Sequence, residues 1–200
     1  MELVFSIFTS LFWILLLYSF DSPDVAGLTI ICAIIHETGH EVFLYRKHGK
    51  LSLPSSRLHG MKISKAAKSK MSYKEEALLY ASGPAANVVA AVAALPFFGA
   101  LNGYVACFIT LNLATAASNL IPIRGYDGYG ILRCLVAEHS DSAAFQACLS
   151  LISFILTLCL CVLSLYLIDR LGEGLWIFAV FILSLLASIA QSLKKPIYEQ

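Results

Sequence analysis

Long uncharged apolar stretches constrain the fold of this chain more than any other feature. They cover residues 3–20, 77–123, 142–168 and 174–193, and a shorter one leads from Val25 into His36. About 20 apolar residues cross a bilayer as one helix, so the 77–123 stretch is long enough for two passes. Asn102 and Gly103 form a turn signal between those passes. We therefore predict an all-α polytopic membrane protein, a single domain over 1–200, with six transmembrane helices at 3–20, 25–46, 75–101, 104–122, 143–168 and 174–193.

Composition supports the membrane class and argues against others. Hydrophobic residues make up 58% of the chain and charged residues only 14%, which is unusual for a soluble domain. The net charge of +1 and the lack of a recognition motif give no case for a nucleic-acid partner. The six cysteines form no Cys-x-x-Cys pair, so no disulfide framework is expected.

The basic residues are concentrated in one predicted loop. Nine of the fourteen lysines and arginines fall between Arg46 and Lys74. Because short loops rich in positive charge stay in the cytoplasm, we expect the 47–74 loop and both termini to be cytoplasmic. The same charges suit contact with lipid headgroups, and topology signalling with lipid contact would account for most of their role.

A metal-binding pattern closes the second predicted span, as His36-Glu37-Thr38-Gly39-His40. Positions four apart share a helix face, so both imidazoles can reach one ion. Two neutral imidazoles suit zinc, and the glutamate between them is placed to take a proton from water on the metal. Ionisable groups at the end of an apolar helix are costly and usually functional. The alternative is that both histidines are interfacial and Glu37 faces water.

A catalytic zinc needs a third protein ligand, and we select Asp127. It follows a break in the apolar stretch, where Pro122, Gly125 and Gly128 favour irregular backbone. Such backbone at membrane depth is tolerated where protein buries it or where it lines a wet cavity. Taken alone, Asp127 is better explained as an ordinary turn residue of a Gly-Tyr-Asp-Gly loop at the membrane interface.

A third polar element, Ser82-Gly83-Pro84-Ala85-Ala86-Asn87, lies within an apolar run. Small residues allow close helix packing, and a buried asparagine needs hydrogen-bond partners. Two roles for Asn87 remain open: it joins helices, or it positions the backbone of a substrate.

Together, these motifs resemble the site-2 protease family of intramembrane zinc metalloproteases. The resemblance rests on His-Glu-x-x-His at 36–40, Gly-Pro-x-x-Asn at 83–87 and Asn-x-x-Pro-x-x-x-x-Asp-Gly at 119–128. It covers a three-helix catalytic core at about 25–130 and leaves 3–20, 143–168 and 174–193 as flanking helices. Tyr126 departs from the family, where leucine is common.

The resemblance implies one Zn²⁺ per chain, bound by His36, His40 and Asp127, with Glu37 as general base. It also implies cleavage of single-span membrane proteins near the cytoplasmic face, releasing membrane-tethered factors. We assign substrate positioning to four motif residues: Gly83, Pro84, Asn87 and Asn119. The short predicted loops leave no room for a PDZ-type insertion, and the seven residues after Leu193 are too few for a C-terminal regulatory domain, so we expect a compact form that resembles the sporulation-type branch without its regulatory domain.

Two other classes of function would use the same residues. A membrane metal transporter could bind its cargo there, but the helix breaks are not symmetric and Glu37 would have no role. The second class is a catalytically inactive membrane-protein chaperone. The three intact motifs argue against it.

A small β-hairpin is predicted after the second helix, from 51–54 and 58–63. Both segments alternate apolar and polar residues, and Pro54 suits a strand edge. An exposed edge there could accept an extended substrate by strand addition. The alternative is an irregular basic loop without a partner.

Overall fold

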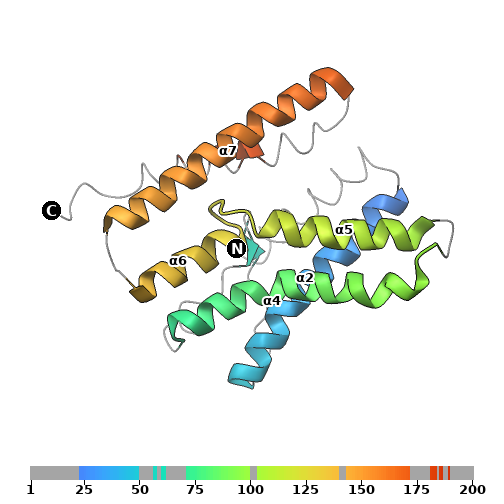
Figure 1. The fold of residues 1–200 in the computed structure, drawn as a ribbon, viewed down its shortest axis with the longest axis horizontal. Coiled ribbons are helices and arrows are strands. Elements are labelled where there is room, and N and C mark those ends of the chain that lie inside the picture. The colour runs from blue at the N-terminus through green and yellow to red at the C-terminus, as the bar shows by residue number, and fades with distance from the viewer. Residues whose placement is uncertain are drawn as a thin grey trace.

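The computed structural model describes residues 23–49, 56–57, 60–61, 71–99, 103–139, 143–171, 181–183, 185–186 and 189. Its elements in chain order are α2 (Pro23–His48), β1 (Ser56–Arg57), β2 (Gly60–Met61), α4 (Tyr73–Ala94), the short 3-10 helix η1 (Leu95–Phe97), α5 (Tyr104–Asn119), α6 (Asp127–His139) and α7 (Ala143–Leu171). Figure 1 shows α5 running alongside α4, with α2 crossing both. Helix α4 contacts α2, α5 and α6, so it is the centre of the described fold.

Local sequence sets the ends of α4. Ser72 and Glu75 form a capping box, in which the Glu75 N–H donates to Ser72 Oγ at 3.3 Å and the Ser72 N–H donates to Glu75 Oε2 at 3.0 Å. Pro84 lies inside the helix and is buried. The helix passes into η1 at Leu95, ahead of the 101 predicted for this span, because Pro96 cannot continue the α-helical hydrogen bonding.

Helix α5 begins after Gly103, which adopts a left-handed conformation with φ 90°, at the turn predicted from the sequence. It ends at Asn119 rather than 122. Residues 120–126 then form an irregular connector. Arg124 ties this connector to α7, donating from its backbone N–H to Ser153 Oγ at 2.7 Å and from Nη2 to Ser150 Oγ at 2.6 Å.

The structure adds one helix that the sequence analysis did not predict. Residues 127–139 form α6, with Asp127 as its first residue, so this carboxylate belongs to a helix start and not to an irregular loop. Gly128 permits the start of α6 to lie close to the connector backbone, because a Cβ there would lie 2.9 Å from the Ile121 carbonyl oxygen and closer still to that of Leu120.

Two segments of the described chain are long and apolar enough to cross a membrane: Tyr73–Phe97 and Ala144–Arg170. They indicate a membrane protein. Helices α2 and α5, at the predicted spans 25–46 and 104–122, are not among these two segments. The predicted spans at 3–20 and, for the most part, 174–193 fall outside the described residues, so the six-span count and the cytoplasmic side of the termini stay predictions.

A short antiparallel pairing lies near the predicted hairpin, but only its second strand falls within a predicted segment: β2 lies inside 58–63, whereas β1 lies between 51–54 and 58–63. Ser56 pairs with Met61 and Arg57 with Gly60. The rest of 51–63 lies outside the described residues, so the extent of the hairpin and its contact with substrate remain predictions.

Candidate metal centre

His36 and His40 face the same way from α2 because they are four residues apart. Both are buried. Their ring centroids are 4.9 Å apart with an angle of 83° between the planes, and their Nε2 atoms are 3.2 Å apart. Two imidazoles therefore present the same type of nitrogen to one point.

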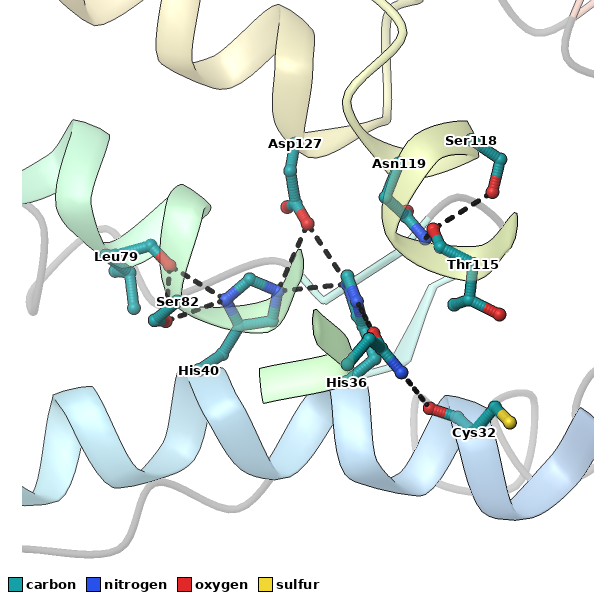
Figure 2. Close-up of polar contacts among 10 residues, drawn as sticks. Cys32, His36, His40, Leu79, Ser82, Thr115, Ser118, Asn119 and Asp127 are labelled. Carbon is teal, nitrogen blue, oxygen red and sulfur yellow. Dashed lines mark hydrogen bonds and ion pairs between the residues drawn. The ribbon is translucent and has the colours of Figure 1, made fainter. Parts of the chain in front are cut away.

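Asp127 reaches this point from the start of α6, as Figure 2 shows. Its Oδ2 atom lies 3.0 Å from Nε2 of His36 and 3.3 Å from Nε2 of His40. One nitrogen or oxygen from each of the three residues lies within 4.8 Å of the others. The structure thus brings together three predicted site residues from distant parts of the sequence.

Hydrogen bonds from α4 determine where the proton of His40 lies. Nδ1 of His40 is 2.8 Å from the carbonyl oxygen of Leu79. A carbonyl can only accept, so Nδ1 carries the hydrogen and Nε2 keeps its lone pair. Ser82 Oγ, which donates to the same carbonyl at 2.7 Å, lies 3.3 Å from Nδ1 and adds a second acceptor.

The proton of His36 is fixed through an amide network. Asn87 Nδ2 donates to the Cys32 carbonyl at 2.9 Å and to Asn112 Oδ1 at 2.8 Å. This orients the amide so that its Oδ1 faces Nδ1 of His36 at 2.9 Å and accepts from it. Both imidazoles therefore hold hydrogen on Nδ1, which is how metal-binding histidines are usually oriented.

These donors fit a divalent cation. With hydrogen on Nδ1, neither Nε2 can donate to Asp127 unless its ring gains a second proton. Asp127 Oδ2 is accordingly a buried oxygen without a hydrogen-bond donor among the described residues. Two nitrogen lone pairs and a carboxylate oxygen that converge at 3.0–3.3 Å repel one another unless a cation lies between them. Two histidines and a carboxylate form a ligand set typical of catalytic zinc.

Glu37 follows His36 on α2 and is half-buried. Its side chain leaves the helix about 100° around the axis from that of His36. Oε2 is buried and accepts no hydrogen bond within the described part of the chain. The residue next to His36 in the sequence thus carries a buried carboxylate oxygen that is able to accept a proton.

Gly83 lies directly against the imidazoles. A Cβ at this position would be 2.8 Å from Cε1 of His36 and closer to Nε2 of His40. Pro84, next in the helix, is buried. The missing side chain of Gly83 lets α4 approach α2 closely, while the role of Gly83 and Pro84 toward a substrate stays a prediction.

Asn87 and Asn119 differ in what they contact. Asn87 is fully buried and bonds to His36, so its described contacts orient a histidine and join three helices. Asn119 is half-buried at the end of α5 and donates to the Thr115 carbonyl of its own helix at 3.0 Å. Substrate positioning by either remains a prediction.

Sequence reasoning missed Asn112 and the Leu79 carbonyl, and it placed Ser82 in a polar element without giving it a role. Asn112 carried a signal, since it is a second amide in an apolar run and must find a hydrogen-bond partner. Its partners are Asn87 and, through Nδ2, the Phe108 carbonyl at 2.9 Å. The Leu79 contact left no sequence signal, because a backbone carbonyl is common to every residue.

The fold and the cluster together define a class: a helical membrane protein in which His36 and His40 of α2 and Asp127 of α6 form a group that could hold a metal ion. The chain is similar in structure to a site-2 protease from Methanocaldococcus jannaschii, with a TM-score of 0.61 over 98% of this chain and 90% of that one. The two sequences are 19% identical, so the likeness establishes a shared fold. No protein-family model matches the chain, and no curated protein matches it.

Proposed function

We propose that this protein is an intramembrane zinc metalloprotease that hydrolyses peptide bonds of membrane-spanning substrates. The observation that carries the proposal is the convergence of His36, His40 and Asp127, with both histidines held in the tautomer that binds metal. The likeness in fold to a site-2 protease supports the same reading.

The chemistry follows from the donors. His36 and His40 would hold one zinc ion through Nε2, and Asp127 through Oδ2. Bound zinc supplies a Lewis acid that polarises a carbonyl and makes water more acidic. Glu37 accepts the proton of the attacking water and returns it to the amide nitrogen that leaves, which is general acid–base catalysis.

The proposed substrate is a single-span membrane protein, cut near the cytoplasmic face, with release of a membrane-tethered factor. Two observations support this choice. The cluster lies within a bundle that has two segments long enough to cross a membrane, and the basic residues are concentrated in the loop that follows His40. Positive loops favour the cytoplasmic side.

Co-expression with tagged single-span proteins tests this function. We expect cleavage with the natural chain and its loss by a factor of about 10²–10⁴ with Glu37→Gln, since the amide cannot accept a proton. Thr38→Val is a matched control, because Thr38 is the exposed neighbour of Glu37 and bonds only to the Ile34 carbonyl of its own helix among the contacts described. Cleavage by Glu37→Gln at the rate of Thr38→Val would contradict the mechanism.

A further inference from the structure

Helix α6 brings Asp127 to the candidate metal centre, so the placement of this helix decides whether the third ligand is in reach. Asp127 is the first residue of α6, and the irregular connector 120–126 precedes it. The helix contacts α4 extensively and α7 more sparsely. The contacts that fix α6 on α4 therefore determine the position of Asp127.

An ion pair between Glu76 of α4 and Arg133 of α6 lies in this contact. Arg133 Nη2 donates to Glu76 Oε1 at 2.8 Å. Only 9% of the Glu76 side chain is exposed, against 42% for Arg133. A buried carboxylate is costly without a cationic partner, and the planar guanidinium gives the pair a defined geometry.

One turn along each helix, Tyr80 packs on Gly130. A Cβ on Gly130 would lie 2.6 Å from Cε2 and Cζ of the Tyr80 ring, so the ring rests against bare helix backbone. Residues 76 and 80, four apart, share a face of α4, and residues 130 and 133 share a face of α6. The ion pair and the ring contact thus act on the same two faces.

The same helix, α4, also orients both histidines. Its Leu79 carbonyl bonds to His40 and its Asn87 side chain bonds to His36. Helix α4 contributes no ligand of its own to the cluster, yet each of the three ligands is held by it, two directly and Asp127 through α6.

We propose that Glu76 and Arg133 are positioning residues for the metal centre: their ion pair fixes α6 on α4 and so holds Asp127 against His36 and His40. This inference rests on the metal site of the proposed function. It predicts that loss of the pair lowers metal affinity by removing Asp127 from the ligand set.

Glu75 provides a matched control, since it is the sequence neighbour of Glu76 but pairs with Lys47 of α2. About a third of each side chain in that pair is exposed, at 34% and 35%. Glu75→Gln keeps the capping box, which accepts glutamine. The two substitutions remove the same charge one residue apart, from pairs that join α4 to different helices.

Co²⁺ titration of the full-length protein in detergent, followed by visible absorbance, measures the effect. We expect Arg133→Met and Glu76→Gln to bind Co²⁺ about 10–100-fold more weakly, the usual loss when a group that orients a ligand is removed. Glu75→Gln should bind like the natural chain. Wild-type affinity in Arg133→Met and Glu76→Gln would overturn the inference and leave the metal site standing, whereas no Co²⁺ binding by the natural chain would remove the metal site itself.

A double-mutant cycle separates positioning from general support of the fold. If Arg133 acts through Asp127, then Arg133→Met should cause no further loss of Co²⁺ affinity when Asp127 is already alanine. A loss that adds to that of Asp127→Ala would overturn the inference. Should Arg133→Met fail to fold, as judged by circular dichroism, Arg133→Lys takes its place. It keeps the charge without the planar fork, and the inference requires an affinity below that of the natural chain.

Discussion

At the scale of single residues, the structure shows how a histidine in an apolar helix is held in one protonation state. Asn112 accepts from Asn87, which in turn accepts from Nδ1 of His36. Each member is buried. The Cys32 and Phe108 carbonyls can only accept hydrogen bonds, so they fix the orientation of the Asn87 and Asn112 amides. The direction of each hydrogen bond from His36 to Asn112 follows from these orientations. His36 therefore presents an unprotonated Nε2.

Asn112→Leu should weaken metal binding although Asn112 touches no ligand atom of the cluster. The substitution keeps the number and branching of the side-chain heavy atoms but removes the acceptor of one Asn87 hydrogen bond, leaving a buried donor unpaired at a cost of about 1–3 kcal/mol. Asn87 is then less firmly oriented toward His36. We expect a lower melting temperature and metal affinity reduced about tenfold, the low end for a group that orients a ligand.

Thr110→Val serves as the control for this change. Thr110 is exposed on the same helix, and its hydroxyl donates to the Ala106 carbonyl one turn before it. Metal affinity, measured by titration of the purified protein, should not change in this variant. Unaltered affinity in Asn112→Leu as well would show that the orientation of Asn87 does not depend on Asn112.

At the scale of elements, the crossing of α2 and α4 sets the distance between the histidines and the groups that orient them. Gly39 lies at this crossing. A Cβ there would be 2.8 Å from Cβ of Ala86 and 3.0 Å from Cα of Gly83, and still closer to the Ser82 carbonyl oxygen. Because these atoms belong to backbone or to a methyl group, none can turn aside.

Gly39→Ala should therefore push α2 and α4 apart, at a cost of about 1–3 kcal/mol for overpacking. The bonds from His40 to Leu79 and from His36 to Asn87 would lengthen. We expect a lower melting temperature and weaker metal binding, measured on the same purified sample. Gly27→Ala on the same helix is the matched control, since a Cβ at Gly27 meets nothing within 4 Å.

The melting temperature of the control variant, Gly27→Ala, is expected to stay the same or rise. Alanine in a helix interior is favoured over glycine by about 0.5–1 kcal/mol, so Gly27→Ala should melt at the same temperature or higher. If Gly39→Ala melts and binds metal as Gly27→Ala does, the close approach at the crossing does not govern the site.

At the scale of the whole molecule, the sequence predicted the helical class and the three residues of the candidate metal centre. Each of these predictions rested on a different physical argument. Apolar length indicated the helices, and the spacing of four placed His36 and His40 on one face. Asp127 was selected as the carboxylate that follows a break in the apolar stretch, and the family resemblance supported this choice, although a Gly-Tyr-Asp-Gly segment taken alone is an ordinary turn. The structure now places that carboxylate 3.0 Å from His36.

What escaped sequence reasoning depends on tertiary contact. Helix α6 was not predicted because its residues are neither continuously apolar nor preceded by an obvious cap, and it is held by α4 through Arg133 and Glu76. The role of the Leu79 carbonyl also needed the structure, since any residue offers one. The orientation of the molecule in the membrane rests on charge distribution, and it stays a prediction.

Restoration of activity by zinc tests the central claim most directly. The full-length protein is placed in lipid vesicles with a tagged single-span substrate, stripped of metal by a chelator, and given zinc in measured amounts while the cleaved product is quantified. We predict no cleavage by the stripped protein, recovery that is complete at one zinc per chain, and no recovery in Glu37→Gln. Cleavage that continues after zinc is removed, or that returns equally in Glu37→Gln, would contradict the assignment.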